Sequence, residues 1–222
     1  MNNLDAIIIG SGPNGLAAAI RLAQIGKRVV VYEANETVGG GSRSAELTLP
    51  GFIHDTCSAI HPLGIGSPFF KTLPLEKYGL QWIQPSAPLA HVWDDGTAVM
   101  LERDVQQTAR HLGRDGAMWA RIFSPLASRW DSFAPMILGS LLRFPRNPFL
   151  LGYFGAWALW SAKFFARRVF REEKTRGLFA GLAAHSTLAL EEPLTASFGM
   201  VLALSAHAVG WPLPRGGSQK IS

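Results

Sequence analysis

Cysteine is nearly absent from this chain of 222 residues, in which Cys57 is the single example. One cysteine cannot form an intrachain disulfide, a thiol–disulfide redox pair, or a cysteine cluster for zinc or iron–sulfur. Those three classes of centre are therefore excluded. Hydrophobic residues make up 48% of the chain, which is enough for a sizeable core and argues against general disorder.

Targeting and membrane-spanning features are also lacking. The N-terminus has no basic segment and no small-residue cleavage site, which argues against a secretory signal. The uncharged stretches 147–162 and 193–214 are too short, or too diluted by polar residues and proline, for a transmembrane helix of about 20 apolar residues. We therefore predict a cytoplasmic protein.

Charged residues are few, at 17%, and unevenly distributed. Residues 1–111 hold 8 basic and 10 acidic side chains, whereas residues 112–222 hold 13 basic and 6 acidic ones. The basic excess lies mainly in Leu141–Arg176, which is also rich in Phe and Trp. We interpret this combination as a peripheral contact with anionic lipid headgroups. Nucleic-acid binding is not predicted, because no recognised nucleic-acid motif is present.

The first 33 residues show the pattern of a βαβ unit. Asp5–Gly10 is a short apolar run with β-branched residues, typical of a strand. Asn14–Gln24 carries apolar residues at helical spacing, and Arg28–Glu33 predicts a second buried strand. The two strands of such a unit are parallel, with a right-handed crossover. The predicted fold class is therefore α/β, with a Rossmann-type βαβ and a parallel sheet.

A G-x-G-x-x-G motif joins the first strand to the helix. Gly10 permits the tight turn, Gly12 lets the backbone approach a pyrophosphate, and Gly15 allows close packing of the helix. The helix N-terminus offers free N–H groups to phosphate. Glu33, at the end of the second strand, can accept hydrogen bonds from both hydroxyls of an adenosine ribose and would repel a 2′-phosphate. The sequence thus predicts a dinucleotide site that disfavours NADP.

A second glycine-rich loop follows Glu33. The stretch from Glu33 to Ser44 contains Gly39, Gly40 and Gly41, with Arg43 just beyond, and it resembles the second fingerprint of FAD enzymes of the phytoene desaturase and amine oxidase type. This resemblance implies FAD as the cofactor, with the arginine near its phosphates, which suits the donor geometry of a guanidinium. The predicted cofactor-binding residues are Gly10, Gly12, Pro13, Asn14, Gly15, Glu33, Ala34, Gly40, Gly41 and Arg43.

The resemblance extends to residues 45–70 and 210–218, which are similar to phytoene desaturase-like proteins also labelled pyridine nucleotide-disulfide oxidoreductase domain proteins. Family members run to roughly twice this length and complete the flavin site with a C-terminal segment. The chain is therefore interpreted as the N-terminal portion of such a protein, and the resemblance leaves open a missing C-terminal half or a homo-oligomer as partner. Whether the chain is an enzyme by itself is also left open.

Three regions are predicted. Residues 1–100 form the first part of the FAD domain, residues 101–210 a mainly helical substrate or cap domain, and residues 211–222 a segment that returns to the FAD domain. Asp94-Asp95-Gly96 predicts a hairpin between 90–93 and 97–101. Asp104 and Asp115 are each predicted to cap a helix, over 105–112 and 116–130 respectively.

Residues with acid–base or metal-binding chemistry form no clear constellation. His54, Asp55, Cys57 and His61 lie close together, but their spacing matches no common zinc pattern, and no metal site is predicted. Cys57 is predicted to be a small buried hydrophobe and the two histidines hydrogen-bonded loop residues, with acid–base groups near a flavin as the alternative. His185 and His207 are predicted to be core or pocket-lining residues. No catalytic residue is identified.

Two functions remain. The first is an FAD-dependent oxidoreductase of the phytoene desaturase or carotenoid isomerase type, acting on an apolar, isoprenoid or lipid-like substrate. The second is a non-catalytic chain that keeps only dinucleotide binding or serves as an interaction module. The aromatic segment Phe149–Phe170 has three readings: the wall of a substrate pocket, a membrane-facing surface, or an ordinary aromatic core.

Overall fold

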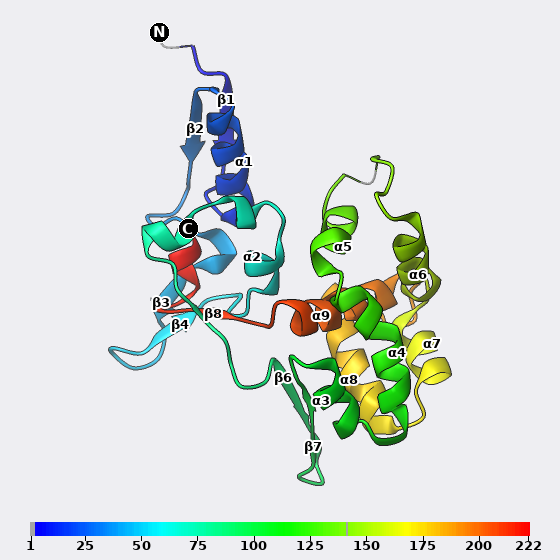
Figure 1. Ribbon diagram of the computed structural model, residues 1–222. Coiled ribbons are helices and arrows are strands. Elements are labelled where there is room, and N and C mark those ends of the chain that lie inside the picture. The colour runs from blue at the N-terminus through cyan, green and yellow to red at the C-terminus, as the bar shows by residue number, and fades with distance from the viewer. Residues whose placement is uncertain (1–2, 141) are drawn as a thin grey trace. The chain divides into compact units, whose positions relative to one another are not determined.

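The computed structural model describes residues 3–140 and 142–222, so Leu141, the first residue of the predicted basic segment, lies outside the described residues. The chain forms two compact units, each assembled from separate stretches (Figure 1). Unit 1 contains residues 1–61, 74–83 and 212–222, and unit 2 contains residues 62–73 and 84–211. Residues 62–73 and 84–100 therefore pack within unit 2, whereas the sequence placed them with the FAD domain.

Unit 1 begins with the βαβ unit that the sequence predicts. Strand β1 (Ala6–Ile9) leads into helix α1 (Pro13–Gln24), and strand β2 (Val29–Tyr32) returns parallel to β1, with Ala6 opposite Val29. The remaining elements of this unit are short: β3 (Ser44–Glu46), β4 (Ile53–Asp55), β5 (Trp82–Ile83), β8 (Leu213–Pro214), and 3-10 turns at Gly40–Ser42, Leu75–Tyr78 and Ser218–Ile221.

Unit 1 contains two antiparallel strand pairs, one local and one between distant segments. Strand β3 pairs with β4, which places Ser44 opposite Asp55. Strand β5 pairs with β8, so residues 82–83 bind the segment that follows residue 211. Unit 1 is therefore closed by segments far apart in sequence, and its longest-range hydrogen bond among the described residues, from the Gln219 side chain to the Val38 carbonyl, spans 181 residues.

Unit 2 is a helical bundle with one hairpin. Strands β6 (Leu89–Val92) and β7 (Ala98–Leu101) pair antiparallel around the predicted Asp94–Gly96 turn. The helices are α2 (Pro62–Gly66), α3 (Val105–His111), α4 (Gly116–Ala127), α5 (Trp130–Ile137), α6 (Pro148–Ala158), α7 (Ala162–Val169), α8 (Glu173–Ala183) and α9 (Thr195–Ala208), with 3-10 turns at Phe70–Thr72, Gly113–Asp115 and Ala184–Ser186.

Aromatic side chains fill the core of unit 2. Trp119 packs on Phe123 with 4.3 Å between ring centroids, and Phe165 packs on Phe179 with 4.5 Å between centroids. Helix α9 carries buried residues on several faces because other helices surround it. The interpretation of the aromatic segment Phe149–Phe170 as part of an ordinary core is thus confirmed for Phe154, Phe165 and Phe170, which are all buried.

The helix ends of unit 2 show one correct and one wrong prediction. The Asp104 carboxylate accepts the Gln107 N–H at 2.7 Å and caps α3 as expected. Asp115 does not cap the helix that follows it. Its carboxylate instead accepts hydrogen bonds from the backbone N–H groups of Arg171 and Glu172, with N···O distances of 2.8 Å. Because these two residues directly precede α8, Asp115 caps that helix. Such a long-range partner has no local sequence signal.

Helix α4 ends at Ala127, three residues before the predicted end, and α5 follows as a separate helix. Pro125 lies in the last turn of α4 and has no N–H for the carbonyl of Arg121 four residues earlier. The hydroxyl of Tyr153 in α6 donates to that carbonyl at 2.8 Å. The missing hydrogen bond of α4 is thereby replaced by a contact that joins α4 to α6.

Every helix among the described residues is too short or too polar to cross a lipid bilayer.

Candidate dinucleotide site

The glycine-rich turn lies between β1 and α1, where the sequence places it. Gly10 has φ +92°, a left-handed conformation that favours glycine, and its N–H donates to the Tyr32 carbonyl at 2.7 Å. A Cβ on Gly15 would lie 2.2 Å from the Gly10 carbonyl oxygen. Gly15 is therefore required for α1 to pack against the turn, and Pro13 and Asn14 form the first turn of that helix.

The second glycine-rich loop packs against the first. The Gly39 N–H donates to the Ser11 carbonyl at 3.0 Å, and Gly39 and Gly40 both have positive φ. A Cβ on Gly40 would lie 3.0 Å from the Gly12 Cα. The two loops thus approach each other backbone to backbone, and the cradle they form would be filled by a side chain at either position.

Glu33 faces the glycine-rich turn. One carboxylate oxygen accepts the Ser11 N–H at 2.8 Å and the Ser11 hydroxyl at 2.6 Å. The other accepts the Asn35 N–H at 2.9 Å and the Asn35 side-chain amide at 2.7 Å. These bonds, those from Ser11 above all, hold the pKa of the Glu33 carboxyl well below its usual range. The sequence did not predict the two partners, although Ser11 lies inside the predicted motif.

Arg43 is anchored to the second loop, because its Nε donates to the Gly40 carbonyl at 3.1 Å. Its Cγ would lie 3.2 Å from a Cβ on Gly39, so the arginine side chain packs against that loop. Gly41, in the same loop, and Ala34, directly after Glu33, are exposed. All ten predicted cofactor-binding residues therefore lie in or directly beside the two loops, while their contact with a cofactor stays a prediction.

The segment after residue 211 returns to the second loop. The Asp55 carboxylate accepts the Ser218 N–H at 2.7 Å and the Ser44 hydroxyl at 2.6 Å. Gly217 has φ +96°, and a Cβ there would lie 2.5 Å from the Ser44 hydroxyl oxygen. His61 Nε2 bonds with the Ser218 hydroxyl at 2.8 Å. Asp55 thus fixes the Pro-Arg-Gly-Gly turn, a structural role that the sequence did not indicate.

The other side chains of the 54–61 cluster have separate partners. His54 bonds with the Thr48 hydroxyl at 2.7 Å, so both histidines are hydrogen-bonded as predicted. His61 is a loop residue, but the loop prediction is wrong for His54, which lies in strand β4. The burial prediction for Cys57 is wrong, because this cysteine is exposed beside Gly41. Within the described part of the chain, no group of three His, Cys, Asp or Glu residues is arranged to hold a metal ion.

The two histidines of unit 2 differ. His207 is buried, and its Nε2 accepts the Trp119 indole N–H at 3.0 Å. Burial lowers the pKa of His207 to about 4, so the ring is neutral in the folded protein at pH 7. His185 is exposed, which corrects its predicted core position, and its Nδ1 lies 3.2 Å from the carbonyls of Gly181 and Leu182.

The comparison with known families agrees with this geometry. Residues 8–73 match the family described as NAD(P)-binding Rossmann-like domain. The parallel β1–β2 pair and the intervening helix confirm the predicted Rossmann-type α/β fold.

Curated relatives match over part of their length. A polypeptide of the limonene dehydrogenase of Castellaniella defragrans is 31% identical over 110 residues, which is 50% of this chain and 20% of that protein. The 1-hydroxycarotenoid 3,4-desaturase of a Flavobacterium species is 32% identical over 47% of this chain and 21% of the desaturase. Pyridine nucleotide-disulfide oxidoreductase domain-containing protein 2 of Rattus norvegicus is 35% identical over 35% of this chain and 13% of that protein.

Solved structures extend the similarity of fold to nearly the whole chain. Cyclohexylamine oxidase from Brevibacterium oxydans has a TM-score of 0.57 at 18% identity and covers 99% of this chain and 48% of its own. Putrescine oxidase has a TM-score of 0.57 at 17% identity, over 98% of this chain and 47% of its own. The predicted resemblance to phytoene desaturase-like proteins is confirmed by the sequence relatives, and the solved structures show that the fold is shared. The chain spans about half the length of these structures and about a fifth of the first two relatives.

Proposed function

We propose that this chain binds FAD and forms part of an oxidoreductase of the phytoene desaturase type. The observation that carries the proposal is the cradle in which the Gly10–Gly15 turn and the Gly39–Gly41 loop meet, with the Glu33 carboxylate directed at the turn. Free N–H groups at the start of α1 suit a pyrophosphate. When bound, a flavin supplies a two-electron acceptor for the removal of hydrogen from a substrate.

Each loop would have a separate task in binding the cofactor. Gly12 and Gly40 keep the space between the loops free of side chains, which lets a diphosphate approach the backbone. A ribose hydroxyl would bind Glu33 by replacing the Asn35 side-chain amide or the Ser11 hydroxyl, since each carboxylate oxygen already accepts two hydrogen bonds. Arg43 would place its guanidinium beside the phosphates.

The substrate class follows from the relatives. The names of two of them specify limonene and a hydroxycarotenoid, both isoprenoids. We propose an apolar, isoprenoid or lipid-like substrate for this protein as well, and a cytoplasmic location. Hydrogen removal from such a molecule by a flavin needs few acid–base side chains, which is consistent with the scattered histidines of unit 1.

A reconstitution experiment tests the FAD site. We expect the full chain to bind FAD, measured by quenching of flavin fluorescence, and to prefer FAD over NADP. Gly12→Val should abolish binding because the side chain fills the cradle. Glu33→Gln should weaken it at least tenfold because a charge-assisted hydrogen bond is lost. Gly152→Val is the matched control, since Gly152 is exposed in α6 with open space around it. Equal binding by Gly12→Val and Gly152→Val would contradict the site.

One observation favours the second function, a nucleotide-binding chain that is not catalytic by itself. Strand β1 leaves Ile7 and Ile9 exposed, at 56% and 80%, whereas helices packed on both faces of a parallel sheet would cover such side chains. In that case the chain would bind FAD but show no turnover of an apolar substrate until a second polypeptide or a second copy covers β1. Turnover by the isolated chain would exclude this alternative.

A further inference from the structure

The segment between α5 and α6 exposes large apolar side chains beside arginines. We define the basic-aromatic tip as Leu142, Arg143, Phe144, Arg146 and Phe149. The exposed fractions of Leu142, Phe144 and Phe149 are 97%, 87% and 89%. Single exposed apolar residues are ordinary. Three almost fully exposed ones within eight positions form an apolar patch, and such patches typically mark a site that binds a partner.

The tip stands on a rigid base. Phe154 in α6 packs edge-on against Phe133 in α5 with 5.0 Å between centroids, and both are buried. The Asn147 side chain caps α6 by accepting the Leu150 N–H at 3.0 Å. Pro145 and Pro148 restrict the backbone of the tip itself. Figure 1 shows residues 142–147 extending beyond the start of α6. The apolar side chains are therefore held outward by a fixed support.

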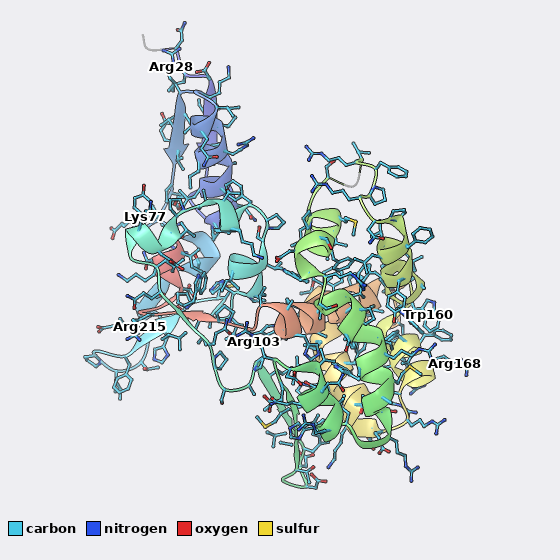
Figure 2. The ribbon with its side chains drawn as sticks, viewed as in Figure 1. Arg28, Lys77, Arg103, Trp160, Arg168 and Arg215 are labelled. Atoms are coloured by element: carbon cyan, nitrogen blue, oxygen red, sulfur yellow. The ribbon has the colours of Figure 1, made fainter. Side chains whose placement is uncertain are left out.

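Charge indicates which partner fits. No Asp or Glu occurs from Ser132 to Arg171, whereas this stretch holds six basic residues: Arg143, Arg146, Lys163, Arg167, Arg168 and Arg171. Figure 2 shows Arg168 extending outward from α7. Exposed apolar side chains interleaved with cations match the interfacial region of a bilayer, where apolar groups enter the acyl boundary and cations meet anionic headgroups.

The shape of the tip favours lipid over a folded protein. Side chains that are nine-tenths exposed protrude and do not line a groove, so a protein partner would need a matching cavity for each, whereas a bilayer deforms around them. We propose that the basic-aromatic tip inserts into the surface of membranes that contain anionic lipid. This inference is independent of the FAD site and does not rest on the proposed function.

Vesicle sedimentation with the full chain tests the proposal. We expect the protein to bind vesicles of phosphatidylcholine mixed with phosphatidylserine, to bind pure phosphatidylcholine vesicles much less, and to dissociate as NaCl is raised. Arg143→Gln/Arg146→Gln should weaken binding about 30-fold, which corresponds to ~1 kcal/mol per arginine near an anionic surface. Leu142→Ser/Phe144→Ser/Phe149→Ser should weaken it at least 100-fold, from the loss of buried apolar area.

A charge-matched control separates the tip from general basicity. Arg110 in α3 and Arg121 in α4 are exposed and form no ion pair within the described parts of the chain. Arg110→Gln/Arg121→Gln removes the same charge and should bind like the wild type. Binding that falls equally in both arginine variants would overturn the proposal.

A fluorescent probe locates the insertion. Cys57→Ser/Phe144→Cys provides one thiol for an environment-sensitive nitrobenzoxadiazole label, and Cys57→Ser/Arg110→Cys is its control. We expect a blue shift on phosphatidylserine vesicles only for the label at 144. Absence of that shift would overturn the proposal. A second outcome would also overturn it. If the wild type does not bind vesicles but forms an oligomer in light scattering, and the triple serine variant does not, the tip is a protein interface.

Discussion

The two units bury different kinds of residue. Unit 2 buries a continuous cluster of aromatic and aliphatic side chains that runs through α4, α7, α8 and α9. In the described part of unit 1, Leu80 is the one buried aliphatic or aromatic side chain apart from prolines. The buried groups around its loops are Ser11, Ser42 and Ser218. Hydrophobic burial is the dominant stabilising contribution in proteins, so unit 2 supplies most of the stability of this chain.

The difference reflects what a phosphate-binding site requires. Large side chains would block the approach of a ligand to backbone N–H groups, so unit 1 uses glycine and hydrogen bonds where unit 2 uses aromatic packing. The contact between Gly12 and Gly40 depends on the missing Cβ of Gly40, because a Cβ there would lie only 3.0 Å from the Gly12 Cα. Unit 1 therefore forms the cradle between its two loops with very few buried hydrophobic side chains.

The largest expected effect on this comparison comes from substituting two adjacent phenylalanines in turn. Phe165 is fully buried in unit 2 and Phe164 is 54% exposed on the same helix. We expect Phe165→Ala to lower the free energy of unfolding by about 3–5 kcal/mol, measured by urea denaturation, because it leaves a cavity in the aromatic cluster. Phe164→Ala should cost less than about 1 kcal/mol. Similar losses from the two substitutions would contradict the core described for unit 2.

The buried histidine gives a pH test of unit 2. The pKa of His207 is about 4 when folded and about 6.5 in an unfolded chain, so only the unfolded state takes up a proton between these values. Stability should be complete above pH 6.5 and fall as the pH drops toward 4, by about 3 kcal/mol at most. His207→Gln should remove this pH dependence, measured as the urea midpoint against pH. An unchanged slope in the variant would assign the dependence to another group.

A smaller effect is expected in unit 1. Asp55→Asn weakens the acceptor of the Ser218 N–H, so hydrogen exchange at that amide should accelerate by about tenfold, which corresponds to ~1 kcal/mol. Burial raises the pKa of Asp55, but the hydrogen bonds from Ser44 and Ser218 outweigh it and the pKa lies below its usual range. The protection should therefore persist at neutral pH and decline as the carboxyl is protonated in acid.

Glu36→Gln serves as the control for this last prediction, because Glu36 is exposed in the same unit. It removes one negative charge without touching the return segment, so exchange at Ser218 should not change. Equal acceleration in the two variants would show that net charge, and not the Asp55 contact, protects the amide.

Local patterns predicted much of the fold. The βαβ unit, the hairpin around Asp94–Gly96 and the Asp104 cap all depend on residues within a few positions of each other, and all were predicted correctly. Periodicity and turn chemistry are sufficient for such features. The two glycine-rich loops were identified for the same reason, since each is a continuous motif.

Contacts between distant segments could not be predicted in this way. Asp115 was assigned to the nearest helix, but it caps α8, which begins more than fifty residues later. The role of Asp55 depends on Ser218, which is 163 residues away in the sequence. The Glu33–Ser11 bond also required the geometry of the folded turn, because a carboxylate 22 residues away has many potential donors.

The division of unit 1 among three stretches of chain has a consequence for biosynthesis. A ribosome makes the glycine-rich loops first, but β8 and Ser218, which bind β5 and Asp55, are made more than 170 residues after Gly41. During that interval the helical unit can collapse while the loops still lack these partners. Proteases and chaperones would thus encounter the nascent N-terminal segment before its last contacts exist, and a ligand could bind the finished cradle only afterwards.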